Sequence, residues 1–143
     1  MDIRRITPDY AVSPQVDPAD LPALAAEGFT TLINNRPDAE VPPEMQSAAM
    51  RAAAEAAGLA YVDNPVVNGG LTMDMVTGQG AALDRSDGPV LAYCRTGTRS
   101  SIVWALGRAG KMPADDILGA LARAGYDLPQ LRGQIEALAA QAG

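Results

Sequence analysis

The chain has 143 residues, a hydrophobic fraction of 48%, few aromatic side chains and a formal net charge of −6 at pH 7. This length predicts one domain over residues 1–143 with an ordinary hydrophobic core. The acidic balance argues against a general nucleic-acid-binding surface. A single cysteine excludes an internal disulfide and fits a reducing compartment. The absence of histidine excludes histidine metal sites and histidine general bases.

The apolar stretches are shorter than a membrane span, and the N-terminus lacks the apolar core of a signal peptide. We therefore expect a cytoplasmic protein that does not bind membranes. The sequence predicts neither a cofactor nor a metal ion.

The first part of the chain alternates extended and helical segments. Residues 6–16 predict two short extended pieces that prolines interrupt. Asp17 is a typical N-cap for the short helix that follows, and Gly28 is a typical helix end. Residues 29–33 are rich in β-forming side chains and predict a core strand, which leads into the polar segment 34–40.

The remaining chain continues this alternation and then becomes helical. Strands are predicted over residues 59–62 and 90–93. Helices are predicted over residues 44–57, from an N-cap at Thr72 to 84, from the first turn near Arg99 to 109, and over residues 113–125 and 129–140. This order predicts an α/β fold with a mainly parallel central sheet flanked by helices on both faces. Ligands of such folds bind at the carboxyl ends of the strands.

The segment after the strand at residues 90–93 carries the strongest functional signal. Cys94, the only cysteine, is followed by a short polar loop that contains Gly97, and then by Arg99. The amides of such a loop and of the following helix N-terminus can point at one anion, and Gly97 permits a backbone conformation that a side chain would block. The planar donors of Arg99 suit a tetrahedral oxyanion. We therefore predict that Cys94 is a thiolate nucleophile aimed at a bound anion.

The length of this loop leaves two chemistries open. Cysteine-dependent phosphatases place five residues between the cysteine and the arginine, whereas four lie between Cys94 and Arg99. The string Cys-Arg-Thr-Gly-Thr-Arg-Ser also resembles the active loop of rhodanese sulfurtransferases, in which a persulfide forms on the cysteine. A shorter ring of amides suits a smaller guest, which favours sulfur transfer. A buried cysteine with only a packing role is the simplest alternative.

Taken whole, the chain resembles the bacterial phosphatase-like family related to the N-terminal domain of beta-lactamase hydrolase-like proteins. The similarity extends over nearly the whole sequence, and its motifs include Ile33-Asn34-Asn35-Arg36-Pro37-Asp38-Ala39-Glu40, Asn64-Pro65-Val66, Cys94-Arg95-Thr96-Gly97-Thr98-Arg99-Ser100 and Ala124-Gly125-Tyr126-Asp127-Leu128. The resemblance implies a fold like that of dual-specificity phosphatases. Rhodaneses usually continue with another strand and a Gly-Gly-x-x-x-Trp ending, which this chain lacks. The scaffold thus resembles a phosphatase, while the loop length resembles a sulfurtransferase.

The resemblance also implies roles for the loop residues. Cys94 would be the nucleophile, Arg99 would hold the equatorial oxygens of a phosphate, and Ser100 would donate a hydrogen bond to the sulfur and ease its departure. The remaining loop residues, whose amides would form the substrate cradle, are Arg95, Thr96, Gly97 and Thr98. The Arg95 side chain is expected on the rim, either attracting an anionic substrate or simply solvated.

A general acid is not obvious in the sequence. Phosphatases of this type usually place a histidine before the cysteine, where this chain has Tyr93, and an aspartate after the preceding strand. The matching position falls near Asn68, a candidate substrate-binding residue whose amide cannot supply the proton. Asp63 is the candidate catalytic acid, with Asp74 as the alternative, although a carboxylate in a first helical turn also has a structural reason. Without an acid, only substrates with good leaving groups would be cleaved well.

Arg36 and Glu40 follow the strand at residues 29–33 and could line the same pocket. An ion pair that braces the turn is the simpler interpretation. Arg36 is nevertheless retained as a candidate substrate-binding residue.

Three functions are compatible with these residues. The main hypothesis is hydrolysis of phosphate monoesters through a cysteinyl-phosphate, without a metal ion. The alternatives are sulfur transfer through a Cys94 persulfide and a non-catalytic domain that binds an anion or a protein. The expected partner is a phosphorylated or other anionic substrate.

Overall fold

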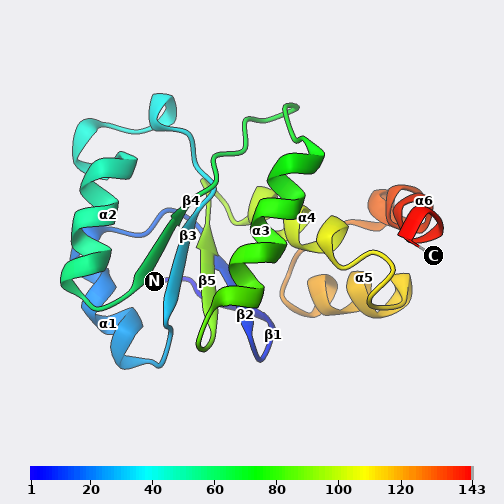
Figure 1. Ribbon diagram of the computed structural model, residues 1–143, viewed down its shortest axis with the longest axis horizontal. Coiled ribbons are helices and arrows are strands. Elements are labelled where there is room, and N and C mark those ends of the chain that lie inside the picture. The colour runs from blue at the N-terminus through cyan, green and yellow to red at the C-terminus, as the bar shows by residue number, and fades with distance from the viewer. Residues whose placement is uncertain (143) are drawn as a thin grey trace.

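A five-stranded mixed sheet forms the centre of the computed structural model, which describes residues 1–142 (Figure 1). The strands are β1 (Arg4–Thr7), β2 (Tyr10–Ser13), β3 (Thr31–Asn34), β4 (Ala60–Asp63) and β5 (Val90–Tyr93). Their order in the sheet is β1-β2-β5-β3-β4, and β1 is antiparallel to β2 while the other neighbouring pairs are parallel. The prediction of a mainly parallel sheet is confirmed, with β1 as an antiparallel edge.

The parallel strands end at the same level. Tyr93 of β5 pairs with Ser13 of β2 on one side and with Asn34 of β3 on the other, and Asn34 pairs with Asp63 of β4. The segments that follow these strands therefore meet at the carboxyl ends of the strands, with the segment after β5 between those after β2 and β3.

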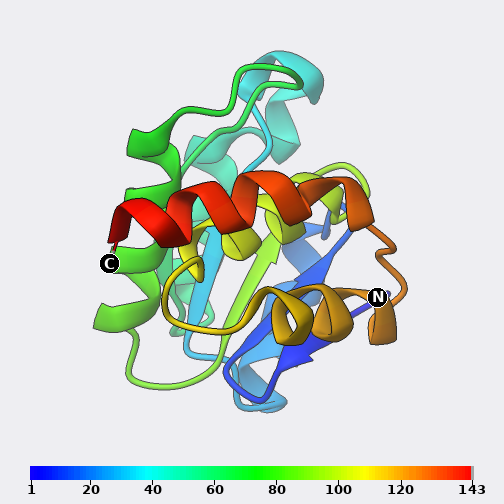
Figure 2. The same cartoon turned by 90° about the vertical axis from the view of Figure 1, so that its right-hand side faces the viewer.

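Helices cover both faces of the sheet, as the alternation predicts (Figure 1). They are α1 (Leu21–Ala26), α2 (Ser47–Ala56), α3 (Met73–Arg85), α4 (Thr98–Gly107), α5 (Ala114–Arg123) and α6 (Arg132–Ala142). One core contains buried side chains of α1 and α2 with Leu32, Leu91 and Tyr93. The opposite core joins Val12, Ile33 and Ala92 to the helices from α3 onward. Figure 2 shows α6 lying across α4, on the outside of this second layer.

The helix boundaries agree with the local sequence signals and differ where prolines intervene. Thr72 is the N-cap of α3, and its hydroxyl accepts a hydrogen bond from the Met75 amide at 3.3 Å. The helix predicted from residue 44 begins at Ser47, because Pro42 and Pro43 introduce a separate 3-10 turn (Pro43–Met45). Within residues 1–142, no helix combines the length and the apolar character that a membrane crossing requires.

Candidate active site

The cysteine loop turns sharply between the central strand β5 and the helix α4. Cys94 follows the strand directly, and its amide donates to the carbonyl of Ser13 at 3.4 Å. Gly97 is the N-cap of α4 and has a φ of 90°, in the left-handed region that favours glycine. A Cβ at this position would also collide with the hydroxyl of Tyr126. Both constraints explain a glycine in the middle of the loop.

The sulfur of Cys94 is fully buried at the base of this loop and is an acceptor there. The Gly97 amide donates to Sγ at 3.1 Å. The first turn of α4 begins directly after this amide, so the positive end of the helix dipole lies at the same place. A backbone donor and a helix N-terminus are both features of loops that bind anions.

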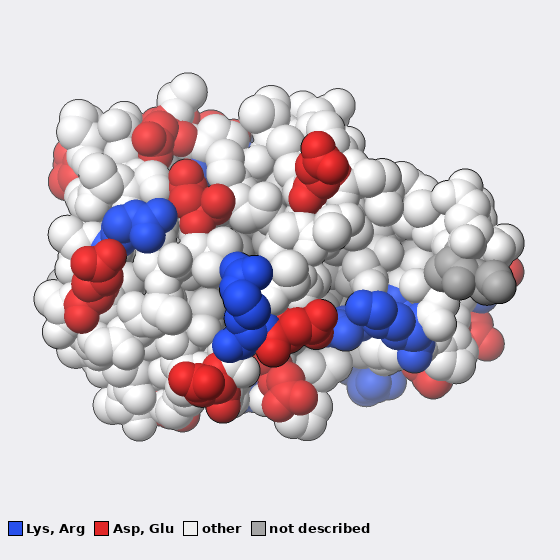
Figure 3. Space-filling view, viewed as in Figure 1, with Lys and Arg blue, Asp and Glu red and all other residues white. Residues whose placement is uncertain are grey.

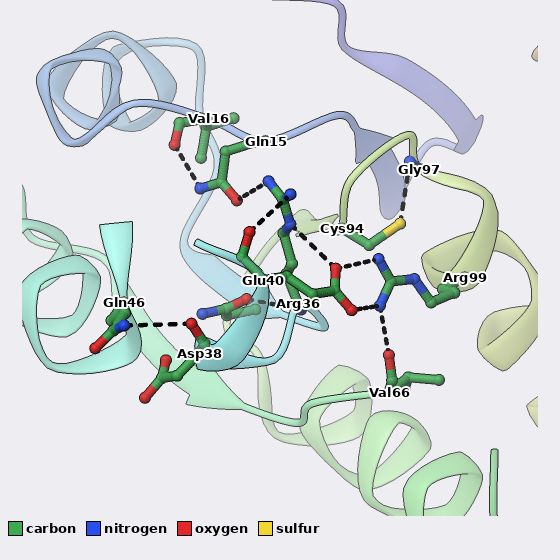
Figure 4. A network of polar contacts seen from close by, with 11 residues as sticks. Gln15, Val16, Arg36, Asp38, Glu40, Gln46, Val66, Cys94, Gly97 and Arg99 are labelled. Carbon is green, nitrogen blue, oxygen red and sulfur yellow. Dashed lines mark hydrogen bonds and ion pairs between the residues drawn. The ribbon is translucent and has the colours of Figure 1, made fainter. Parts of the chain in front are cut away.

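Arg99 lies near the sulfur of Cys94 and is hydrogen-bonded to the carboxylate of Glu40 (Figure 4). This pair was not predicted from the sequence. The two terminal nitrogens of Arg99 donate to the two oxygens of Glu40 at 2.8 and 2.7 Å, and Nη1 also donates to the Val66 carbonyl at 2.7 Å. Figure 4 shows the sulfur on the opposite side of the guanidinium from Val66. These three bonds fix the plane of the guanidinium next to Cys94.

Electrostatic interactions keep both Glu40 and Arg99 charged. The Arg99 guanidinium, assisted by Arg36, holds the pKa of the Glu40 carboxyl below its ordinary value. The pKa of Arg99 is raised, first by Glu40 and then by Cys94. Glu40 is therefore a carboxylate over the neutral range and cannot serve as a proton donor there.

Arg36 braces Glu40, as the simpler interpretation of the sequence predicts. Its Nε donates to Glu40 Oε1 at 3.2 Å, and Nη2 donates to the Glu40 carbonyl at 3.3 Å. Its third contact is to Gln15 Oε1 at 3.2 Å. Arg36 thus contacts Glu40, which in turn holds Arg99, and its role as a substrate contact stays a prediction.

Ser100 makes a different contact from the one that the resemblance implied. Its hydroxyl is buried and donates to Asn35 Oδ1 at 2.8 Å, so the predicted hydrogen bond to the Cys94 sulfur is wrong for this structure. The physical reason is the position of Asn35, which follows β3 and offers its oxygen to the first turn of α4. Gln79 donates to the same oxygen at 3.0 Å and to the Tyr10 hydroxyl at 3.1 Å.

This buried polar network ties the loop to its surroundings. The Tyr10 hydroxyl donates to the Ser100 carbonyl at 2.7 Å, and the Asn35 amide donates back to Gln79 at 2.9 Å. Asn64, after β4, donates to Gln79 Oε1 at 2.7 Å. A satisfied network of this kind specifies one arrangement of the strand ends and helix starts. Sequence reasoning did not identify Gln79, whose only signal was a polar residue on the inward face of a helix.

The position of Asp63 argues against its predicted role as the general acid, a role that stays a prediction. Asp63 ends the edge strand β4, so β3 separates it from β5. Asp63 pairs with Asn34, and Asn34 pairs with Tyr93, whose side chain packs against α1 and α2. Cys94 is the residue after Tyr93, and successive side chains along a strand alternate between the two faces of the sheet. Partial burial raises the pKa of Asp63. Its charged neighbours are Asp38 and Arg51.

The other predicted residues occupy the positions expected of a loop and its rim. Arg95 and Thr96 are exposed, and the hydroxyls of Thr96 and Thr98 are 3.1 Å apart. Asn68 lies with Val66 and Arg99 around a hollow of about 120 Å³. Asp74 is exposed in the first turn of α3, where the structural reason suffices. Asn68 therefore stays a prediction as a substrate contact.

Figure 3 shows how charged side chains are distributed over one face of the molecule. On the face seen in Figure 3, acidic and basic side chains are interspersed among broad uncharged areas. No group of three or more acidic, histidine or cysteine side chains within residues 1–142 is arranged to hold a metal ion.

The fold, a mixed sheet with helices on both faces, is shared with solved structures of phosphatases. A candidate phosphatase from Neisseria meningitidis has a solved structure that superposes with a TM-score of 0.81 at 33% identity, covering 96% of this chain and 99% of that one. Tk-PTP in its active form gives a TM-score of 0.76 at 17% identity, covering 98% of this chain and 97% of that one, which shows the shared fold.

The chain belongs to the family of phosphatase-like domains of beta-lactamase hydrolase-like proteins, whose family model matches residues 2–111. A beta-lactamase hydrolase-like protein of Agrobacterium fabrum is 34% identical over 126 residues, 87% of this chain and 29% of that protein. One from Xylella fastidiosa is 33% identical over 130 residues, 90% of this chain and 30% of that protein. The resemblance inferred from the sequence is confirmed, and the chain spans about 30% of the length of these relatives.

Proposed function

We propose that this domain hydrolyses phosphate monoesters through a phosphorylated Cys94. The thiolate attacks phosphorus, the bond from phosphorus to the leaving oxygen breaks, and a cysteinyl-phosphate forms. Water then attacks the same phosphorus, and the thiolate departs with its electron pair. The observation that carries this proposal is the hydrogen bond from the Gly97 amide to the buried sulfur, with the Arg99 guanidinium close enough to interact electrostatically with the same cysteine.

Binding of the phosphate would use backbone amides at the start of α4. Amides at the start of α4 lack carbonyl partners within the helix, so a bound anion can accept from them. Arg99 adds positive charge in an orientation that Glu40 and Val66 hold. These groups would stabilise the charge on the equatorial oxygens in the transition state.

The leaving group would depart without a proton from the protein. Asp63 ends the edge strand β4, which β3 separates from β5, and the carboxylate paired with Arg99 is held ionised between two arginines. Esters of acidic phenols should therefore be the best substrates, because their oxyanions are stable leaving groups. TpbA of P. aeruginosa, which shares the fold, has been crystallised in complex with pTyr, an aryl phosphate.

Sulfur transfer is the second candidate, and the short loop together with the missing acid favours it. The Cys94 thiolate would attack the outer sulfur of thiosulfate, the S–S bond would break, and sulfite would leave with the electron pair. The persulfide sulfur would then pass to a thiophilic acceptor such as cyanide. Sulfite departs as an anion, so this reaction needs no general acid.

Two assays on the purified chain separate these candidates. Wild type and Cys94→Ser are compared for release of p-nitrophenol from p-nitrophenyl phosphate and for release of thiocyanate from thiosulfate and cyanide. The proposal expects p-nitrophenol release from the wild type and none above background from Cys94→Ser. Thiocyanate release alone would establish the second candidate. Equal rates for wild type and variant in both assays would leave a non-catalytic anion-binding domain.

A further inference from the structure

One peptide group of the loop is held at both of its ends. The peptide that joins Thr96 to Gly97 presents its N–H to the Cys94 sulfur at 3.1 Å. Its carbonyl, on the opposite side, accepts a hydrogen bond from the hydroxyl of Tyr126 at 3.0 Å. Because the C=O and N–H of a trans peptide point in opposite directions, the two bonds fix one orientation together.

We propose that Tyr126 is a positioning residue for the nucleophile Cys94. By donating a hydrogen bond to the Thr96 carbonyl, Tyr126 holds the Gly97 amide of the same peptide against the Cys94 sulfur. This inference rests on the proposed function of Cys94 as a thiolate nucleophile. Tyr126 lies beyond residues 2–111, the part of the chain that the family model matches. The nucleophile thus depends on a segment that follows the matched part.

The loop after α5 is built to deliver this hydroxyl. The Tyr126 amide donates to the Leu121 carbonyl at 2.8 Å, and Gly125 has a φ of 100°, which ends the helix and turns the chain. Arg4 of β1 donates to the Ala124 carbonyl at 3.0 Å. A Cβ at Gly125 would collide with the Arg4 guanidinium, which therefore lies directly against this turn.

The position of Tyr126 distinguishes positioning from catalysis. The hydroxyl contacts the outer side of the loop, and a Cβ on Gly97 would meet both the tyrosine and the backbone of Ser13. The sulfur lies across the peptide, so Tyr126 acts on it through the Gly97 amide. Burial raises the pKa of Tyr126 against an opposing effect of Arg4, so the hydroxyl keeps its proton over the neutral range.

The test is Tyr126→Phe, which removes only the hydroxyl, with Tyr61→Phe as the matched control. The Tyr61 hydroxyl also makes two hydrogen bonds, to Asn34 and Ser47, but at the other side of the sheet. Amide hydrogen exchange by NMR reports the Gly97 N–H. Absorbance at 240 nm, read as the difference from the matching Cys94→Ser form, reports the thiolate, because the chain has one cysteine.

Loss of one hydrogen bond should speed exchange of the Gly97 amide by roughly 2- to 10-fold and move thiolate formation upward by roughly 0.5 to 1 pH unit. Tyr61→Phe should change neither quantity. Unchanged Gly97 exchange, or faster exchange with an unmoved thiolate titration, would overturn the proposal. A wild type without any Cys94-dependent thiolate signal would contradict the proposed function, and Gly97 exchange would still decide the role of Tyr126.

A measurement on unmutated tyrosine covers the case in which Tyr126→Phe does not fold. The ¹³Cζ resonance of Tyr126 should shift as Cys94 ionises and should lose this shift in Cys94→Ser. A resonance that does not respond to Cys94 would overturn the proposal.

Discussion

Replacing Glu40 by glutamine tests whether this carboxylate holds Arg99 in place or competes with the substrate for it. Glutamine keeps the size of the side chain, but it removes the charge and offers Arg99 one acceptor where Glu40 offers two. The two bonds lost or weakened are 2.8 and 2.7 Å long, and the Arg99 side chain is 9% exposed. Both observations indicate a strong, charge-assisted contact.

The magnitude follows from these contacts. Hydrogen bonds to charged groups contribute about 1.5–3 kcal/mol where they are protected. The 28% exposure of the Glu40 side chain screens part of this energy, so we expect a net loss of about 1–2 kcal/mol. If that energy positions Arg99 in the transition state, kcat/KM falls roughly 5- to 30-fold, since about 1.4 kcal/mol corresponds to a factor of ten.

The assay is kcat/KM for p-nitrophenyl phosphate, with Glu44→Gln as the control because Glu44 is an exposed glutamate on the same connection. Glu44→Gln should retain wild-type kcat/KM. An unchanged or increased kcat/KM for Glu40→Gln would refute the reasoning, and an increase would show that Glu40 blocks Arg99.

The remaining predictions concern the loop, the network, the candidate acid and pH. Gly97→Ala should lower kcat/KM at least about 100-fold, because the left-handed backbone and the Tyr126 contact both resist a side chain; retention of activity would contradict the loop geometry. Gln79→Leu should lower the free energy of unfolding in urea by about 2–4 kcal/mol, because it leaves buried Asn35 and Asn64 groups without partners; a change below about 0.5 kcal/mol would show that the network is dispensable. Asp63→Asn should leave kcat/KM within about twofold of wild type. A changed alkaline limb in the pH profile of kcat/KM would instead show that Asp63 is the general acid. Because the folded-state pKa of Glu40 lies below 4.5, its stabilising contribution is present above that pH and is lost as the pH falls through the folded value; the Tm difference between wild type and Glu40→Gln should shrink there, and a constant difference would contradict the ion pair.

Much of the fold could be predicted because local signals and their order agree. A proline-bounded apolar run before Cys94 predicted the central strand, and its burial on both faces is what a parallel strand requires. The cap at Thr72 and the polar loop before α4 were equally local. The antiparallel direction of β1 could not be predicted from local signals, because its pairing with β2 depends on tertiary neighbours.

The candidate site was predicted only in part, for a related reason. Residues 94–99 are contiguous, so their convergence could be inferred from the loop itself. The Glu40–Arg99 pair and the Tyr126 contact join residues 59 and 30 positions apart. They depend on β3 lying beside β5 and on α5 returning over β1, which no short pattern encodes. The distance in the sheet between Asp63 and the cysteine strand could not be predicted, because the sequence does not reveal that β4 is an edge strand and that β3 separates it from β5.

The central claim is that Cys94 carries the phosphoryl group, and direct detection of the intermediate tests it best. The chain is mixed with excess p-nitrophenyl phosphate, quenched in acid within the first turnovers, digested and examined by mass spectrometry. The account predicts a phosphoryl group on the sulfur of the peptide containing Cys94, which disappears when the substrate is exhausted. A Cys94 peptide that stays unmodified while p-nitrophenol is released would contradict the account.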